Sequence, residues 1–305
     1  MNEDKAYIFI DTDIGDDIDD AFAVSLAANS DDCELVGVST VFRNTALRAK
    51  QTVELLNACK KKAPVYAGEG MPLSKKIPLF GFEKDGDELL YSIPCQYDES
   101  SMASLEYSSE NGVDAIISAA KKYSGKLILV PIGGLTNIAA AILKDPSIKN
   151  DVKAIYAMHG WYGNFAPEWN VICDPEAANV VYSSGIPFYG VGLDVTLKCT
   201  LDNDLLEAFR LSEKPYNKLV VSYMDRWFDK FHFEKSVMHD PLALCAAIGY
   251  PVCSFERRYV KAVTEGNLRG AVETSTEPKE GFYPITAAME VNKNAFYDVI
   301  KKILL

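Results

Sequence analysis

The start of the chain changes abruptly from apolar to acidic and then back again. Residues 7–10 form a short apolar run, and the ten residues from Asp11 to Asp20 include six aspartates. The run is too short for a buried helix and does not alternate, so it predicts a strand covered on both faces. Asp19 or Asp20 is expected to cap a following helix, whose apolar face is marked by Ala21, Val24 and Ala28. The pattern predicts a strand, an acidic loop and a helix.

The same succession of strands and helices continues to the end of the chain. Apolar runs without helical spacing predict strands at residues 34–42, 64–67, 127–130, 152–158, 187–192, 259–263, 270–273 and 285–291. Helical spacing predicts helices at residues 112–123, 138–143, 175–182, 202–211, 216–231, 242–248 and 295–304, and a helix with the apolar face Ala46, Ala49, Val53 and Leu56. Residues 68–109 show no sustained period and are expected to run over the surface. We predict a single α/β domain, residues 1–305, with one open, mainly parallel sheet and helices on both faces.

Polar clusters follow several of the predicted strands directly. They are the acidic loop, Asn44, the glycine-rich turn Pro131–Asn137 and the loop His159–Asn170. Open α/β sheets bind their ligands outside the carboxyl ends of the strands. These clusters are therefore expected to share one rim of the sheet.

The acidic loop favours a bound cation. Its carboxylates repel one another unless some accept backbone N–H groups or bind a metal ion. Hard cations prefer carboxylate and carbonyl oxygens, so Asp13, a later loop aspartate and Asp240 suit calcium or magnesium better than zinc. An EF-hand is excluded, because a loop counted from Asp11 has Asp16 and Phe22 where glycine and glutamate are required. A solvated acidic turn, or the Asp-x-Asp loop of a haloacid-dehalogenase-type phosphatase, are the alternatives.

The overall charge narrows the choice of partners. The net charge is −12 and the pI about 4.8, which argues against nucleic acid or an anionic membrane as a partner. No apolar stretch reaches about 18 residues and the N-terminus lacks a signal-like pattern, so we expect a cytoplasmic protein that crosses no membrane. The seven cysteines are scattered and contain no Cys-x-x-Cys pair, which favours reduced thiols.

The residue types of the rim point to the chemistry of sugars. Asn44, Asn164 and Asn170 can hydrogen-bond vicinal hydroxyl groups, and carboxylates can stabilise an oxocarbenium-like transition state. No serine or cysteine is placed as an obvious nucleophile, and no lysine-bearing phosphate loop is present. With a metal ion that activates water, these residues suggest hydrolysis of a sugar derivative.

Five motifs occur in order across residues 7–248. They are Asp11-Thr-Asp-Ile-Gly15 with Asp19-Asp-Ala-Phe-Ala23, Ser39–Asn44, Val130–Asn137, Gly163–Asn170 with Asp174–Ala178, and His239-Asp-Pro241. In this order and spacing the chain resembles the inosine-uridine-preferring nucleoside hydrolases. The resemblance implies an open α/β domain, a tightly held calcium ion, and hydrolysis of the N-glycosidic bond of ribonucleosides to ribose and free base. It also implies a homodimer or homotetramer.

The resemblance assigns roles to individual residues. Asp13 is expected to bind calcium and to take the proton of the attacking water, and Asp11 to support it. The further calcium ligands are expected to be Asp20, Asp240 and the backbone carbonyl of Ile132. The expected ribose contacts are Asp19, Asn44, Asn164, Glu168 and Asn170. His239, near the base, is expected to be the second catalytic residue beside Asp13. The aromatic residues that could stack on a base or fill the core are Trp161, Trp169, Tyr223, Trp227, Phe228 and Phe231.

Two departures from the family pattern leave alternatives open. The loop has two extra residues between Gly15 and Asp19, so Asp17 competes with Asp19 and Asp20 for a direct role. The family's His-Gly segment, which helps the base to leave, is missing, and the region reads Leu79-Phe-Gly-Phe-Glu-Lys-Asp-Gly86. The alternative to a hydrolase is a calcium- and riboside-binding member of the family with altered or no hydrolase activity.

Overall fold

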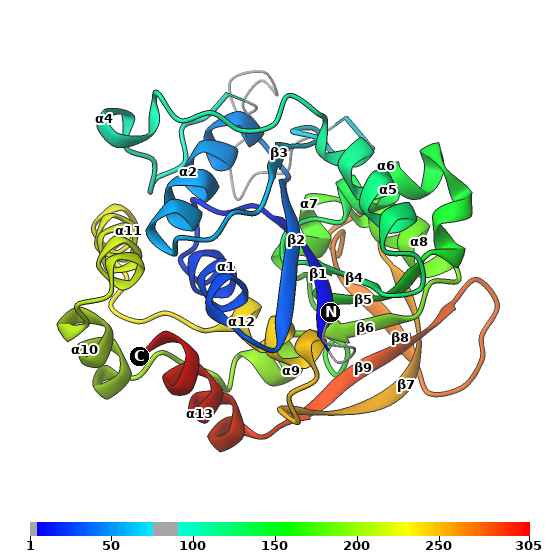
Figure 1. The fold of residues 1–305 in the computed structure, drawn as a ribbon. Coiled ribbons are helices and arrows are strands. Elements are labelled where there is room, and N and C mark those ends of the chain that lie inside the picture. Colours follow the sequence, from blue (N-terminus) through cyan, green and yellow to red (C-terminus); the bar gives the residue numbers. More distant parts are fainter. Residues whose placement is uncertain (1–4, 76–90) are drawn as a thin grey trace.

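The computed structural model describes residues 5–75 and 91–305, so the segment Leu79–Gly86 lies outside the described residues. Nine strands form one sheet in the order β3-β2-β1-β4-β5-β6-β9-β7-β8 (Figure 1). Their bounds are β1 Ala6–Thr12, β2 Cys33–Thr40, β3 Val65–Ala67, β4 Leu127–Pro131, β5 Val152–Met158, β6 Phe188–Val191, β7 Cys253–Ala262, β8 Val272–Ser275 and β9 Tyr283–Val291. From β3 to β9 all neighbours are parallel, and β7 is antiparallel to both β9 and β8. The predicted mainly parallel α/β sheet is confirmed.

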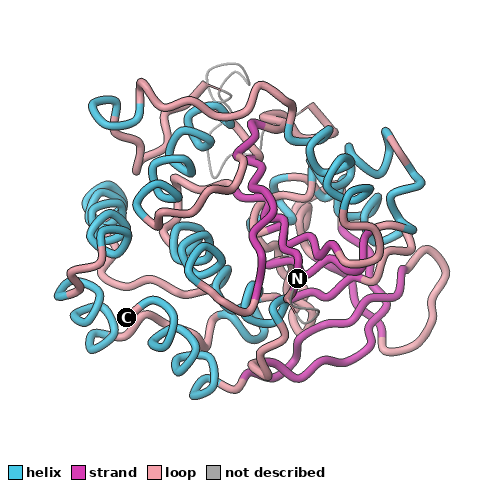
Figure 2. Tube along the Cα trace, in the orientation of Figure 1, coloured by secondary structure: helices cyan, strands magenta, loops and turns pink. Residues whose placement is uncertain are grey.

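Helices cover both faces of this sheet (Figures 1 and 2). The helices of the first part of the chain are α1 Asp19–Asn29, α2 Thr45–Ala58, α4 Glu99–Met102, α5 Gly112–Lys122, α6 Thr136–Lys144, the 3-10 turn η1 Pro146–Asn150, α7 Trp169–Cys173 and α8 Pro175–Ser183. The later helices are α9 Leu193–Thr196, α10 Asn203–Leu211, α11 Pro215–Phe231, α12 His239–Ile248 and α13 Lys293–Leu304. None of the helices described combines the length and apolar character needed to cross a bilayer.

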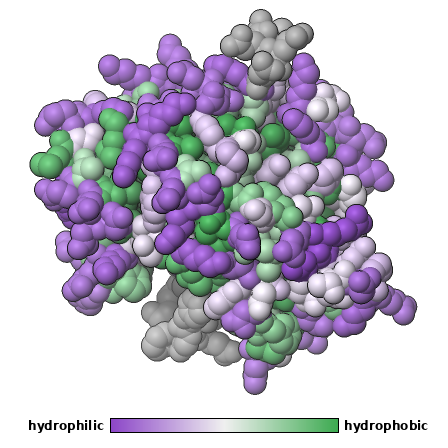
Figure 3. Space-filling view, turned by 90° about the horizontal axis from the view of Figure 1, so that it is seen from below, coloured by the Kyte–Doolittle hydropathy of each residue, from purple (hydrophilic) through white to green (hydrophobic). Residues whose placement is uncertain are grey.

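Two hydrophobic cores lie on opposite sides of the sheet. Ile8 and Ile10 of β1 belong to the core shared with α1, α11, α12 and α13, whereas Phe9 belongs to the core shared with α5, α6 and α8. Successive side chains of a strand point to opposite faces, so β1 contributes to both cores. This explains why its sequence is a continuous apolar run. Outside these layers, Figure 3 shows one face of the molecule on which hydrophilic residues surround smaller hydrophobic areas.

Helix α1 begins differently from the prediction. Its N-cap is Ile18, which gives no side-chain cap, so the expectation that Asp19 or Asp20 caps the helix was wrong. Both aspartates lie inside the first turn and are buried. The positive end of the helix dipole favours carboxylates at this position. Their side chains are therefore not used as a cap and remain available to the pocket described below.

The buried face of α2 is rotated from the predicted one. Ala49 and Leu56 are buried as expected, but Ala46 and Val53 are only partly buried. The other buried residues of the helix are Arg48, Gln51, Thr52 and Leu55. Polar side chains occupy this face because it meets the acidic loop as well as the core.

Two other features of the secondary structure differ from the prediction. Strand β7 begins at Cys253, earlier than the predicted 259, and the short helices α4, α7 and α9 were not predicted.

One buried asparagine ties the rim of the sheet together. Asn137 donates through Nδ2 to Asp11 Oδ1 at 2.8 Å and to the Thr40 carbonyl at 3.0 Å. Its Oδ1 accepts from the Glu69 backbone N–H at 2.7 Å. The first turn of α6 is therefore joined to the ends of β1, β2 and β3 through one side chain.

We expect Asn137→Ala to lower the free energy of unfolding by about 2–4 kcal/mol, because it leaves several buried polar groups without partners. Denaturant titration measures this loss. Asn29→Ala is the control, since Asn29 is partly buried and donates one bond to the Ser25 carbonyl, and it should cost about 1 kcal/mol or less. Equal losses in the two variants would contradict the role given to Asn137.

Candidate functional site

A pocket of about 210 Å³ opens where the acidic loop meets the ends of the central strands. The loop follows β1, Ile132 follows β4, and Met158 is the last residue of β5. The carboxyl edge of an open α/β sheet is the usual place for a ligand. The pocket is lined by Asp13, Asp16, Asp17, Asp19, Asp20, Ile132, Met158, Pro167, Glu168, Trp169, Asn170, Leu193, His239 and Asp240. Segments far apart in the sequence converge here, as the positions of the polar clusters predicted.

Three buried carboxylates form the tightest group of acids in this pocket. Among the described residues, oxygens of Asp19, Asp20 and Asp240 all lie within 4.8 Å of one another. Asp20 Oδ1 accepts from Thr12 Oγ1 at 2.5 Å, and Asp19 Oδ2 accepts from the Asp240 backbone N–H at 3.1 Å. Burial and the neighbouring carboxylates raise the pKa of all three well above the usual value. Such a group can hold a divalent cation, which would relieve the repulsion.

Asp13 lines the same pocket but lies outside that group of three. Its carboxylate is close to the glycine-rich turn, because a Cβ placed on Gly133 would lie 2.8 Å from Asp13 Oδ1. Burial raises the pKa of Asp13 to about 6, and the charge of Arg48 acts against this rise. Ile132, whose carbonyl was expected to bind the metal, accepts a hydrogen bond there from Asn170 Nδ2 at 3.1 Å.

Asp11 does not line the pocket, although it belongs to the same acidic segment as Asp13. It is fully buried, and its Oδ1 accepts from Ser39 Oγ at 2.6 Å and from Asn137 Nδ2. Its Oδ2 has no hydrogen-bond partner within the described part of the chain. Burial raises the pKa of Asp11 to about 7.

Glu168 and Asn170 are fixed at the start of the short helix α7. Glu168 is its N-cap and accepts backbone N–H groups of Gly160 at 2.9 Å, Asn170 at 2.9 Å and Val171 at 3.1 Å. Asn170 Nδ2 also donates to the Met158 carbonyl at 3.0 Å. Both side chains are buried, and both line the pocket. A carboxylate and an amide held this firmly are suited to binding hydroxyl groups.

His239 is the first residue of α12 and places its imidazole in the pocket lining. Its Nδ1 lies 2.7 Å from Thr196 Oγ1. Burial lowers the pKa of His239 to about 4, so the ring is neutral at pH 7.

Trp169, one of the aromatic residues expected to stack on a base or fill the core, lines the pocket and makes an edge contact with Phe42 at 6.0 Å between ring centres.

Two expected ribose contacts do not line this pocket. Asn44 caps α2 by accepting from the Leu47 N–H at 3.2 Å, and its Nδ2 donates to the Tyr91 carbonyl at 3.3 Å. Asn164 is exposed and lines a neighbouring pocket of about 370 Å³ with Phe165 and Lys279. Their roles at the ribose stay predictions.

The extra residues of the loop are also at the pocket. Asp17 lines it together with Asp19 and Asp20 and accepts the Ile18 backbone N–H at 2.6 Å, and a direct role for Asp17 stays a prediction. Asp16, to which the sequence gave no role, lines the pocket and forms an ion pair with Arg48 at 2.7 Å. No role was predicted for Arg48 from the sequence. The available signal was its spacing, because Arg48, Gln51, Thr52 and Leu55 recur at i, i+3, i+4 and i+7.

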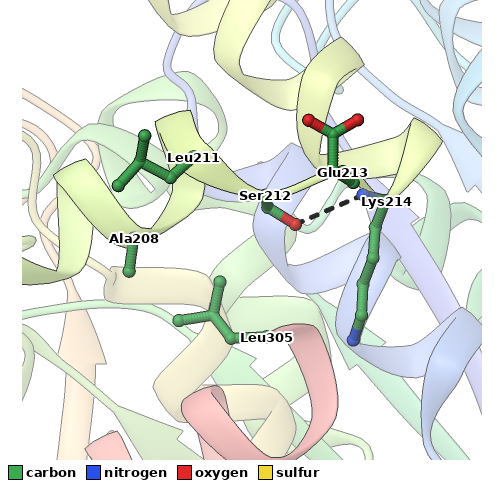
Figure 4. Close-up of a pocket in the computed structure, with 6 residues that line it drawn as sticks. All are labelled: Ala208, Leu211, Ser212, Glu213, Lys214 and Leu305. Carbon is green, nitrogen blue, oxygen red and sulfur yellow. Dashed lines mark hydrogen bonds between the residues drawn. The ribbon is translucent and has the colours of Figure 1, made fainter.

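A larger hollow lies elsewhere on the molecule, between α10, the start of α11 and the C-terminus (Figure 4). Its volume is about 470 Å³, and its lining is Ala208, Leu211, Ser212, Glu213, Lys214 and Leu305. Within it, the Lys214 backbone N–H donates to Ser212 Oγ at 3.4 Å. The charged side chains in its lining are one carboxylate and one ammonium group, so it lacks the cluster of acids found in the first pocket. The first pocket is therefore the candidate functional site.

Known proteins with similar sequences are nucleoside hydrolases. The family model described as inosine-uridine preferring nucleoside hydrolase matches residues 8–298. The protein named probable uridine nucleosidase 1 of Oryza sativa subsp. japonica is 28% identical over 326 residues, covering 100% of this chain and 98% of the rice protein. The pyrimidine-specific ribonucleoside hydrolase RihB of Escherichia coli O9:H4 (strain HS) is 31% identical over 258 residues, covering 81% of this chain and 78% of the bacterial protein.

Solved structures show the same fold. The plant nucleoside hydrolase PpNRh1 superimposes with a TM-score of 0.84 at 21% identity and 98% coverage of both chains. The purine-preferring ribonucleoside hydrolase from Gardnerella vaginalis gives a TM-score of 0.74 at 25% identity and 96% coverage of both chains. With a family model that matches nearly the whole chain, these likenesses confirm the resemblance of the five motifs. The chain belongs to the inosine-uridine preferring nucleoside hydrolase family.

Proposed function

We propose that this protein hydrolyses the N-glycosidic bond of ribonucleosides in a calcium-dependent reaction. The observation that carries the proposal is the convergence of loop aspartates, Asp240 and the Glu168–Asn170 pair in one pocket, in a chain of this family. The acids supply places for a cation and a base, and the neighbouring amide and carboxylate supply partners for hydroxyl groups. Names of relatives, which mention uridine and pyrimidine ribonucleosides, are in keeping with this substrate class.

The donor set fits a calcium ion. Two oxygens on opposite sides of calcium are about 4.6–5.2 Å apart, because each Ca–O distance is about 2.3–2.6 Å. The oxygens of Asp19, Asp20 and Asp240 lie within 4.8 Å of one another. We assign Asp13, Asp20, Asp240 and the Ile132 carbonyl as the residues that would hold the ion, and Asp19 to the ribose or to the ion. When bound, calcium lowers the pKa of water and orients it.

Asp13 is the proposed general base. It accepts a proton from the attacking water, whose oxygen bonds to C1′ of the ribose while the bond from C1′ to the base nitrogen breaks. The bonding electrons leave with the base, which takes up a proton from solvent and is released, and Asp13 then returns its proton to solvent, so that one water molecule is consumed. Positive charge that develops on the sugar is stabilised by the surrounding carboxylates.

The ribose is proposed to lie against Asp19, Glu168 and Asn170, with Asn44 and Asn164 as further contacts. Glu168 and Asn170 are held by backbone groups, so little ordering is needed when a hydroxyl binds. We place the base against Pro167, Trp169, Leu193 and His239, which are four of the non-acidic residues of the lining. This lining offers stacking and apolar contact, which favours broad acceptance of bases. Assembly as a homodimer or homotetramer, a single domain and a cytoplasmic location stay predictions.

Calcium at about 100 times its dissociation constant should stabilise the protein by about 2.7 kcal/mol. Asp240→Asn should remove most of this gain, and its metal-free form should be at least as stable as the metal-free wild type, because one repelling carboxylate is gone. Thermal unfolding with calcium or chelator measures both. Asp225→Asn, which alters only an exposed ion pair with Arg210, should keep the gain. Full activity of protein shown to be metal-free by elemental analysis would refute calcium dependence.

Asp13→Asn should lower kcat by about 10²–10⁴, the usual loss for a general base, while the variant stays folded. Steady-state kinetics on uridine and inosine, with circular dichroism of the same samples, test this. Asp114→Asn is the matched control, because Asp114 is a surface residue paired with Lys144. Near wild-type turnover of Asp13→Asn would show that another group takes the proton.

Ribosides should be strongly preferred to 2′-deoxyribosides, by up to about 10⁴–10⁵ in kcat/KM, because a missing hydroxyl leaves buried polar groups unpaired. The assay compares inosine, uridine, their 2′-deoxy forms and p-nitrophenyl riboside, with and without chelator. Comparable rates on deoxy and ribo substrates would overturn the ribose contacts. A protein that binds calcium and ribosides but releases no sugar would instead be the non-hydrolytic member of the family.

A further inference from the structure

Arg48 is the largest of the fully buried side chains among the described residues, with 1% of its surface exposed. It lies in the first turns of α2, directly after the loop that follows β2. Burying a guanidinium group is costly unless its donors and its charge are compensated. The partners of Arg48 therefore show what the protein gains from this arrangement.

In the part of the chain that the structure describes, all hydrogen-bond partners of the Arg48 guanidinium belong to loops at the rim of the sheet. Nε donates to the Phe42 carbonyl at 2.9 Å, one terminal nitrogen donates to the carbonyls of Asp13 and Ile14, and the other donates to Asp16 Oδ2 at 2.7 Å. The Ile14 bond is 2.8 Å long. A planar guanidinium can serve these partners together because its donors have a fixed fork geometry, which a lysine ammonium lacks.

These contacts act on the carboxylate assigned as the base. A hydrogen bond to the Asp13 carbonyl fixes the peptide plane next to the Asp13 Cα, and thereby limits the directions open to its side chain. Gly133 also confines the Asp13 carboxylate, since there is no room for a Cβ at that position. Arg48 itself does not line the pocket. It reaches the reacting groups only through the acidic loop.

The charge of Arg48 matters as well as its hydrogen bonds. Burial alone would raise the pKa of Asp16, but Arg48 and Arg43 hold it below the usual value. Arg43 is the more distant partner, with its guanidinium 3.9 Å from Asp16. The positive charge of Arg48 is therefore placed under the loop, where it offsets part of the repulsion between the acids whether or not a cation is bound.

We propose that Arg48 is a positioning residue for the hydrolysis, which holds the acidic loop by the carbonyls of Asp13 and Ile14 and the carboxylate of Asp16. This inference rests on the proposed function. It assigns to Arg48 two effects that a purely structural arginine would not have. One is the alignment of Asp13 with the attacking water, and the other is the preservation of the calcium-binding shape of the loop.

Arg48→Lys keeps the positive charge and removes the planar guanidinium with its fixed arrangement of donors. We expect kcat to fall by about 10- to 100-fold, the usual loss when a reacting group is displaced by about 1 Å, with KM changed by about threefold or less. Calcium affinity, measured by calorimetry on the folded variant, should fall at least about tenfold because the loop is less ordered before binding. Arg210→Lys is the control, since both terminal nitrogens of Arg210 donate to a carboxylate, that of Asp225, on the surface away from the pocket.

A variant with lower stability but unchanged kcat and calcium affinity would overturn the proposal, because Arg48 would then act on folding alone. If Arg48→Lys does not fold, Asp16→Asn decides, since that side chain is 36% exposed and its loss is better tolerated. It removes the ionic partner of Arg48, so kcat and calcium affinity should each fall by about three- to tenfold, the loss expected for one charge-assisted hydrogen bond. No change in either would also overturn the proposal. If the wild type hydrolyses no riboside, the proposed function fails, while the calcium titrations still test Arg48.

Discussion

Repulsion among buried carboxylates is the constraint to which the rest of the structure responds. Two unit charges 4.8 Å apart repel by about 3 kcal/mol at an effective dielectric constant of 20, and Asp19, Asp20 and Asp240 come at least this close. One hydrogen bond contributes only about 1 kcal/mol. Hydrogen bonds alone therefore do not offset the repulsion when all three carboxylates are ionised, and a proton or a divalent cation can relieve this electrostatic strain.

The scaffold limits this strain by bringing donors from many directions. Thr12 donates to Asp20 from the end of β1, Ser39 donates to Asp11 from β2, and Asn137 donates to Asp11 from the start of α6. Arg48 adds a positive charge from α2. Parallel strands end at the same edge of a sheet, so each contributes a polar group without burying a long loop. The carboxylates are held by the architecture of the sheet as much as by the loop that carries them.

The antiparallel end of the sheet supports the side of the pocket formed by Pro167 and Glu168. The Glu168 backbone N–H donates to the Gly270 carbonyl at 3.1 Å, and a bridge joins Pro167 to Ala271. Gly270 has a φ of +91°, and a Cβ there would lie 2.8 Å from the Ile172 Cα. Only glycine allows this close approach without strain. The connection after β7 thus fixes the segment that caps α7 and places the Glu168 carboxylate.

Much of the fold could be predicted from local patterns. The apolar run at the start of the chain, the later buried strands and the long amphipathic helices follow from spacing that each segment carries within itself. The predictions failed where a boundary depended on a distant partner. Ile18 precedes α1 because the next two aspartates face the pocket, and the face of α2 is rotated because Arg48 and Gln51 meet loops rather than aliphatic side chains.

The sequence by itself determined which residue types gather at the rim, because each polar cluster follows a strand and parallel strands share one carboxyl edge. Together with the resemblance of the five motifs to a known family, it indicated Asp13, Asp20, Asp240, Glu168 and Asn170. Only the tertiary structure decided which of those side chains lie close together and how their negative charges are compensated. Asp19 rather than Asp13 completes the closest set of acids, Asn44 and Asn164 line no part of that pocket, and Arg48 lies beneath the loop. Charge compensation depends on distances between segments far apart in the chain, and no local pattern specifies those distances.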